Sequence, residues 1–157
     1  TKPVIYAQGS LAMLSNKKLD FSKDIDVITT KEVKKIAVAN PKTAPYGKAA
    51  IEAIKNAKLY KDVDSKFVFA ESISQTVSYA VTAADIGFIA KSSLYSPKMS
   101  HYKEGVNWRD VDPKLYTPIN QGIVMLNKQD KEVKAFYDFM LGDKAKKILN
   151  DFGYLVP

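Results

Sequence analysis

The sequence predicts an α/β fold, a mostly parallel sheet with helices on both faces. Three short, compact apolar segments are typical of strands that are covered on both sides. Amphipathic segments of helical period lie between them, and this alternation favours parallel strands joined by crossover helices. The 157 residues can bury roughly 68–70% of the unfolded surface, enough for one real core.

The first elements lead into the sheet. β-branched and aromatic residues at Val4–Tyr6 predict a strand, and the apolar segment Leu11–Leu14 continues it after Gly9-Ser10. The polar stretch that follows is expected to be a loop, with a short helix around Lys31–Lys34.

The next unit is a strand followed by a helix. Lys35–Ala39 is an apolar strand that Asn40-Pro41 ends. A helix is expected from about Gly47 to Lys58, with apolar residues on one face. Its opposite, solvated face is expected to carry Lys48, Glu52, Lys55 and Asn56.

The unit then repeats. Phe67–Ala70 is expected as a strand, Gln75–Ala84 as an amphipathic helix and Asp85–Ala90 as a third buried strand.

The C-terminal part is less regular at first. Lys98–Pro118 shows no period and is expected to be an irregular loop. A strand is expected at Gln121–Leu126, and helices at Asp130–Met140 and Asp143–Phe152, with Gly142 between the two helices.

Composition argues against several functions. The formal charge is +7, but Arg109 is the only arginine, and nucleic-acid readers favour arginine for its bidentate geometry. We therefore expect a solvated, lysine-rich surface and no nucleic-acid partner. No apolar run is long enough for a membrane span, so we expect no direct membrane insertion. The absence of cysteine excludes thiolate catalysis and disulfides.

The residues needed for catalysis are also missing. His101 is the only histidine, lies in the irregular loop and has no carboxylate or serine placed for a relay, so we expect an exposed side chain. The Walker, G-x-G-x-x-G and G-x-S-x-G motifs are absent. Acidic pairs such as Asp24/Asp26 lack the other ligands of a calcium loop. We expect no enzyme, no catalytic residue, no cofactor and no metal-cation site.

Two strand-to-helix turns carry the informative pattern. They are Ala39–Gly47 and Ala70–Gln75, and in a parallel sheet both lie at the carboxyl edge, where α/β proteins bind ligands. Free N–H groups and the dipole make a helix N-terminus an anion site. The alternative is a pair of ordinary turns in which Ser72 or Ser74 is the N-cap.

The turns also carry a resemblance. Residues 40–47 read N-P-x-x-A-P-Y-G, and this motif with its surroundings resembles periplasmic molybdate- and tungstate-binding proteins, the receptors of an ABC importer. The matching segments are Lys35–Ala50, Glu71–Gln75, Ala84–Ala90, Tyr116–Gly122, Ala135–Met140 and Ile148–Tyr154.

The resemblance implies a type II periplasmic-binding-protein fold of two lobes joined by crossing strands. Residues 9–115 are expected to form the complete second lobe, and residues 1–8 and 116–157 the crossing strands and the C-terminal part of the first lobe. The serine-bearing turns with which such receptors begin have no counterpart here. We therefore expect that roughly the first third of the mature protein, with its export signal, is missing.

The resemblance also implies the site. The oxyanion accepts hydrogen bonds from the backbone N–H groups of Tyr46 and Ile73, with Pro45, Gly47 and Ser72 supporting the turns. Gly47 is expected to let the chain approach the ligand. Some members add a tyrosine hydroxyl after the third strand, where this chain has Ala90.

The implied function is capture of molybdate or tungstate in the periplasm and delivery to the permease of an ABC transporter, by a protein that is monomeric when intact. The alternative from another class is the ligand-sensing effector domain of a LysR-type transcription regulator, which shares the two-lobed fold.

Overall fold

The computed structural model describes residues 2–157. The strands are β1 (Val4–Gly9), β2 (Leu11–Leu14), β3 (Ile36–Ala39), β4 (Phe67–Ala70), β5 (Ile86–Ala90), β6 (Trp108–Asp110) and β7 (Ile119–Ile123). The α-helices are α1 (Pro45–Asn56), α2 (Tyr60–Val63), α3 (Ile73–Thr82), α4 (Lys131–Leu141) and α5 (Asp143–Asp151). The 3₁₀-helices are η1 (Phe21–Thr29), η2 (Asp64–Lys66), η3 (Lys91–Tyr95), η4 (Pro97–Met99) and η5 (Pro113–Leu115).

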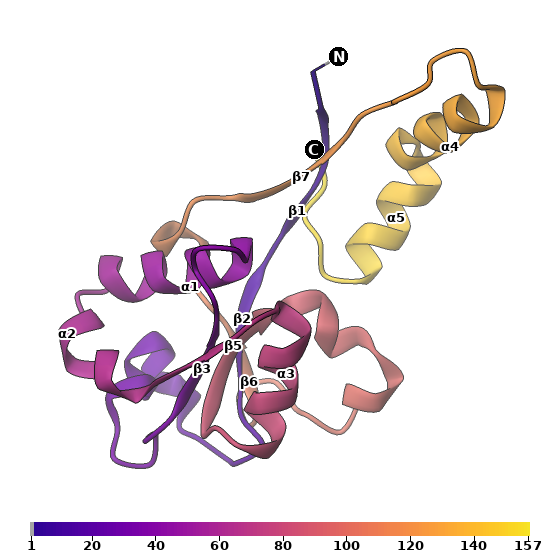
Figure 1. Cartoon of the computed structure of the whole chain (residues 1–157). Helices are drawn as coiled ribbons and strands as arrows, with labels where there is room; N and C mark the ends of the chain where they lie inside the picture. The colour runs from indigo at the N-terminus through magenta and orange to yellow at the C-terminus, as the bar shows by residue number, and fades with distance from the viewer. Residues whose placement is uncertain (1) are drawn as a thin grey trace.

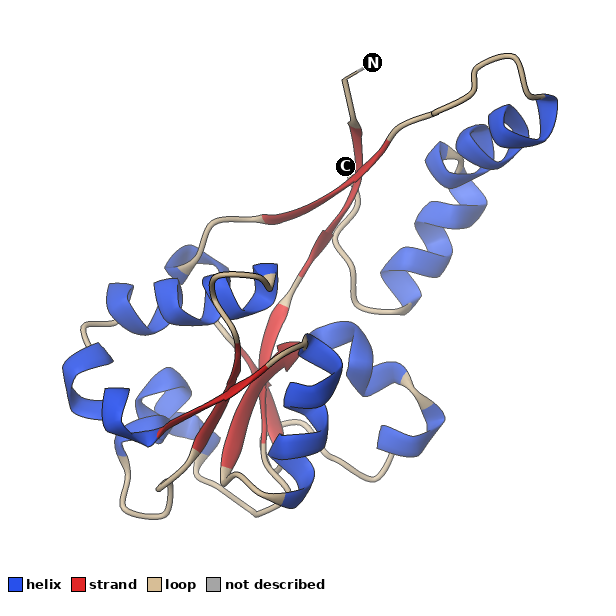
Figure 2. Ribbon diagram, in the orientation of Figure 1, coloured by secondary structure: helices blue, strands red, loops and turns tan. Residues whose placement is uncertain are grey.

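Five strands form one mixed sheet in the order β4-β3-β5-β2-β6 (Figures 1 and 2). Strand β3 is parallel to β4 and to β5, whereas β2 pairs antiparallel with both β5 and β6. The α/β class is confirmed, but the sheet is mixed where a mostly parallel one was expected.

The reversed direction of β2 follows from how the chain enters the sheet. Strand β1 leads through Ser10 directly into β2, and the N–H of Lys91, just after β5, donates to the Ser10 carbonyl at 2.8 Å. Strand β2 therefore starts where β5 ends. All four residues of β2 are buried, as in a central parallel strand, so the apolar pattern contains no information on direction.

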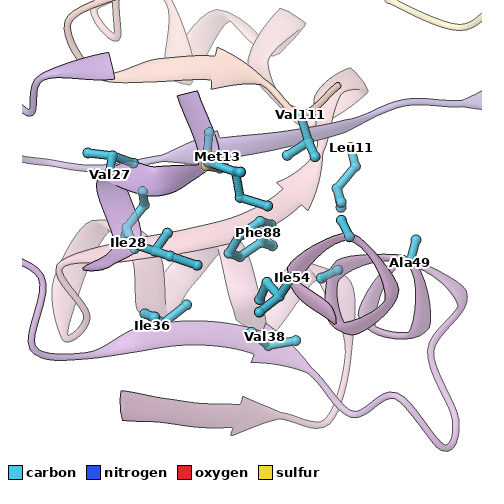
Figure 3. Close-up of a cluster of buried hydrophobic side chains, with 14 of the residues drawn as sticks. Leu11, Met13, Val27, Ile28, Ile36, Val38, Ala49, Ile54, Phe88 and Val111 are labelled. Carbon is cyan, nitrogen blue, oxygen red and sulfur yellow. The ribbon is translucent and has the colours of Figure 1, made fainter. Parts of the chain in front are cut away.

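Helices cover both faces of the sheet. Leu11 and Met13 of β2 belong to one buried cluster, to which α1 contributes Ile54 (Figure 3). Leu14 belongs to a second cluster, to which α3 contributes Ala80. Because side chains alternate along a strand, α1 and α3 lie on opposite faces of the same sheet.

The two crossing strands form a separate antiparallel pair. Strand β1 pairs with β7, and near the C-terminus Leu155 exchanges two backbone hydrogen bonds with Gln8, of 2.7 and 2.9 Å. Figure 1 shows that this pair leads away from the five-stranded sheet toward the α4–α5 hairpin. The hairpin leaves large apolar side chains exposed, with 61% of Phe136 and 43% of Phe139 accessible, while Leu149 is half-buried.

Several local expectations need correction. Residues Lys31–Lys34 are not helical, and the helical segment is instead η1, where Asp20 accepts the N–H of Ser22 and caps it. The stretch Lys98–Pro118 contains β6, a short edge strand whose three residues are all partly exposed. The remaining predicted helices and strands are present with ends shifted by one to a few residues. No helix in the described part of the chain is long and apolar enough to cross a membrane.

Candidate functional site

The two informative turns start side by side. Strands β3 and β4 are parallel and in register, with Ala39 opposite Ala70. The N–H of Asn40, the first residue after β3, donates to the Ala70 carbonyl at 2.8 Å. Both chains therefore leave the sheet at one edge, and each continues into a helix whose N-terminus lies near that edge (Figure 1).

The first turn is closed by Asn40. Its carbonyl accepts the N–H groups of Thr43 and Ala44 at 3.1 and 2.8 Å, and its side chain accepts the N–H of Lys42 at 3.0 Å. Ala44 is extended and has no side chain that could cap α1, and Pro45 begins the helix. The N–H of Tyr46 is thus a first-turn donor without a carbonyl in its own helix.

Gly47 has a structural role that differs from the expected one. A Cβ at this position would lie 2.0 Å from the carbonyl oxygen of Ala39 and 2.6 Å from its carbon. The first turn of α1 therefore rests directly on the end of β3. The missing side chain makes room for protein backbone, whereas the sequence led us to expect room for a ligand.

The second turn is capped from both sides. Ser72 is the N-cap of α3, and its hydroxyl accepts the N–H of Gln75 at 3.1 Å. The Gln75 side chain in turn accepts the N–H of Glu71 at 2.7 Å. The arrangement resembles a capping box, except that Gln75 accepts the N–H of Glu71, one residue before the N-cap. Of the two N-caps that the sequence left open, Ser72 and Ser74, the structure has Ser72. These two hydrogen bonds use the N–H groups of Glu71 and Gln75. The N–H of Ile73, the first residue of α3, lies between them in the sequence and has no carbonyl partner within its own helix.

The edge therefore offers two positive helix ends. Helices α1 and α3 run along opposite faces, but their first turns follow neighbouring parallel strands. Each helix N-terminus has a partial positive charge and free N–H donors. Such an arrangement can bind an anion with backbone groups alone, without a charged side chain.

The third strand of this edge contributes no free cation. Strand β5 ends at Ala90, and the next residue, Lys91, has its ammonium 2.9 Å from a carboxylate oxygen of Asp110. Partial burial opposes the charge of Lys91, but the hydrogen bond to Asp110 and the nearby negative charge of Asp110 and Glu104 act together against burial and raise the pKa of the ammonium. Asp110 belongs to β6, the edge strand farthest from β4, so this charge pair sits away from the two turns.

The side chain of Tyr46 belongs to a group of tyrosines beside the crossing strands. Burial raises the pKa of Tyr46 to about 12, and Tyr154, Tyr116 and Tyr6 act in the same direction. Burial also raises the pKa of Tyr116, whose hydroxyl accepts the N–H of Leu11 at 3.0 Å. Tyr46 and Tyr116 therefore remain protonated at neutral pH. Only Tyr46 was singled out from the sequence, because no local motif brings the four together.

Helix α1 is tied to the chain that returns into β7. One carboxylate oxygen of Glu52 accepts both the N–H and the hydroxyl of Thr117, at 3.0 and 2.7 Å. The amide of Asn56 donates to the Leu115 carbonyl at 2.7 Å. Asn56 is exposed, as expected for the solvated face, and Glu52 is partly exposed because the returning chain covers one side of it. A cavity of about 220 Å³ lies alongside, lined by Pro45, Lys48, Ala49, Glu52, Thr117, Pro118, Ile119 and Asn120.

The other chemical candidates of the sequence were the single histidine and the acidic residues. His101 is exposed, and its ring lies 4.0 Å from that of Tyr102, measured between centroids. No group of three or more histidine, cysteine or acidic side chains in this part of the chain could hold a metal ion.

Comparisons with known proteins agree with the resemblance seen in the sequence. The profile of the family described as bacterial extracellular solute-binding protein matches residues 1–155. The molybdate-binding protein ModA of Rhodobacter capsulatus is 35% identical over 153 residues, which are 96% of this chain and 58% of that protein. The ModA protein of Azotobacter vinelandii is 34% identical over 152 residues, which are 95% of this chain and 59% of that protein. The chain thus spans less than two thirds of these relatives.

The fold comparison gives the same result. The structure of the Azotobacter vinelandii periplasmic molybdate-binding protein matches with a TM-score of 0.83 at 26% identity, and the match covers 99% of this chain and 68% of that one. Sequence and fold therefore agree from one end of the chain nearly to the other. On these grounds the chain belongs to the family of bacterial extracellular solute-binding proteins.

Proposed function

We propose that the chain is the oxyanion-binding part of a receptor that captures molybdate or tungstate and delivers it to an ABC transporter. The observation that carries this proposal is the pair of first turns, at Tyr46 and Ile73, that follow neighbouring parallel strands at one sheet edge. Both curated relatives described above are named for molybdate binding.

The donor set suits this ligand. Molybdate is a fully deprotonated tetrahedral dianion near neutral pH, so its oxygens only accept hydrogen bonds. Backbone N–H groups only donate, and each helix dipole adds positive potential at its own N-terminus on this sheet edge. A monoprotonated phosphate would require an acceptor, which such a site does not supply. Sulfate has the same charge and proton count as molybdate, so we expect its rejection to depend on the size of the site.

The rest of the proposed role follows from the family. We expect a non-enzymatic protein without a resident cofactor that works outside the cytoplasm, in the periplasm, and meets the permease of the importer. We expect the intact protein to be a monomer and to bind no nucleic acid. Tyr46 and Ile73 are its proposed ligand residues, with Pro45, Gly47 and Ser72 holding their turns. The family match supports this receptor over the effector domain of a LysR-type regulator.

Residues 9–115 are the proposed second lobe, which supplies about half of the donors. We propose that the remaining donors lie in the part of the relatives that this chain does not span. Loss of two charge-assisted hydrogen bonds, each contributing ~1.5–3 kcal/mol, lowers affinity by about a hundredfold or more.

Titration calorimetry tests this division of the site. The 157-residue chain is expected to bind molybdate about a hundredfold or more weakly than the Rhodobacter capsulatus relative, with sulfate weaker still. Micromolar or tighter binding by this chain would contradict the divided site. Equal affinity for molybdate, sulfate and phosphate would contradict the assignment of the ligand.

A further inference from the structure

The Tyr46 ring lies against the crossing strand β1. Gly9, the last residue of β1, is buried and pairs with Ile119 of β7. A Cβ on Gly9 would lie 2.0 Å from the Tyr46 hydroxyl oxygen, 2.8 Å from Cζ and 3.3 Å from Cε1. The end of the ring therefore occupies the space that any side chain at position 9 would need.

The main chain of Tyr46 is held in place through the next residue, Gly47. Its neighbour Gly47 rests on the carbonyl of Ala39 in β3, where a Cβ would lie only 2.0 Å away. Tyr46 thus touches the crossing strand through its ring and adjoins the five-stranded sheet through its main chain. Its N–H, a proposed oxyanion donor, is on the same residue, one bond away from the Cα that bears the ring.

We propose that Gly9 is a positioning residue of the oxyanion site: the Tyr46 ring seats on Gly9, and this contact fixes where the Tyr46 N–H lies. The inference rests on the proposed function, since it concerns the geometry of that same site. It also gives the crossing strand a direct mechanical connection to the ligand, because a shift of β1 at Gly9 moves the ring and the first turn of α1 with it. A displaced donor forms a longer and weaker hydrogen bond.

A double-mutant cycle separates this coupling from a general effect on β1. The variants are Gly9→Ala, Tyr46→Ala and the two combined, all made in the 157-residue chain. Gly9→Ala is expected to weaken molybdate binding by about tenfold when Tyr46 is present, the equivalent of one well-placed hydrogen bond. In the Tyr46→Ala background the same change is expected to have less than about a twofold effect, since the ring is no longer there to be displaced.

Gly122→Ala is the matched control. Gly122 lies in β7 opposite Ile5. The atoms nearest to a Cβ there would be the side chains of Pro3, at 3.2 Å, and Ile5, at 3.8 Å, and the carbonyl oxygen of Val4, at 4.0 Å. It is a crossing-strand glycine with no contact to Tyr46, so its replacement is expected to leave molybdate binding within about twofold of the unmodified chain.

A pH titration reports on the ring without any ligand. The ionisation of Tyr46, isolated by subtracting the ultraviolet titration of Tyr46→Phe, is expected near pH 12 in the unmodified chain. In Gly9→Ala it is expected to move down toward the ordinary tyrosine value of about 10, because the displaced ring gains contact with water.

The outcomes are distinct. An equal loss of affinity on Gly9→Ala in both Tyr46 backgrounds, or an unchanged ionisation of Tyr46, would overturn the proposed contact. If the unmodified chain and the Rhodobacter capsulatus relative bound molybdate alike in strength and Gly9→Ala still moved the Tyr46 ionisation, the divided site would fail while the ring contact held. A shift of the ionisation together with a coupled loss of affinity supports the inference.

Discussion

Replacing Gly47 with alanine is expected to destabilise the fold by about 1–3 kcal/mol or more, and to disturb the proposed oxyanion site with it. Alanine is the better helix former by about 1 kcal/mol, so propensity alone predicts the opposite sign. The new Cβ, however, would lie 2.0 Å from the Ala39 carbonyl oxygen, which is backbone at the end of the interior strand β3. The clash decides the sign, because neither partner can rotate away and α1 must shift from β3.

Chemical denaturation measures this change. Lys48→Ala is the matched control, since Lys48 is the next residue in the first turn of α1 and its side chain is exposed. It is expected to alter the free energy of unfolding by no more than about 0.5 kcal/mol. A Gly47→Ala variant as stable as the unmodified chain would contradict the close contact between the first turn of α1 and the end of β3.

Replacing Ile73 with proline is expected to weaken molybdate binding by ~1–3 kcal/mol, about five- to 150-fold, while the helix remains. Ile73 is the first residue of α3, a position that accepts proline because its N–H has no partner in the helix. Ser72 before it is already extended, with φ −142° and ψ 164°, the conformation that a following proline requires. The substitution therefore removes one donor and leaves the hydrogen bonds accepted by the Ser72 and Gln75 side chains in place.

Ile73→Ala separates the donor from the side chain. It removes the same apolar group but keeps the N–H, so the difference in affinity between the alanine and proline variants isolates the hydrogen bond. Far-ultraviolet circular dichroism verifies that α3 persists in both. Equal affinities for molybdate would show that Ile73 is not a ligand. Tyr46→Pro, also expected to weaken binding by ~1–3 kcal/mol, is a less clean test, because it would disturb the helical conformation of Pro45.

Local patterns predicted the elements that hold the proposed site. The apolar strands before the two turns and the amphipathic helices after them are present as predicted. Such elements can be predicted because the hydrophobic period of a strand or helix depends only on residues close together in the sequence. The direction of β2 could not be predicted, because Leu11–Leu14 is buried on both faces and looks the same in either direction. Strand β6 was not predicted, because its Trp-Arg-Asp sequence is short and partly exposed.

Long-range polar and steric contacts could not be predicted from the sequence, because the partners are far apart along the chain. Glu52 has the spacing of a solvated helix face, and only the fold brings Thr117 to it. The contact of Gly9 with Tyr46 likewise joins segments that no local pattern relates. The neighbour of Gly47 is the Ala39 carbonyl, and no rule of turn chemistry distinguishes a glycine that makes room for a ligand from one that makes room for backbone.

The most direct test of the central claim is a molybdate titration of the isotope-labelled chain followed by amide NMR. The account predicts that the amides of Tyr46 and Ile73 shift together along a single saturation curve in the millimolar range. The amides of Lys34 and Lys35, which precede β3 at the other end of the sheet, are expected not to move. Shifts at only one of the two donors, or saturable shifts confined to other parts of the chain, would contradict a shared oxyanion site at the ends of β3 and β4.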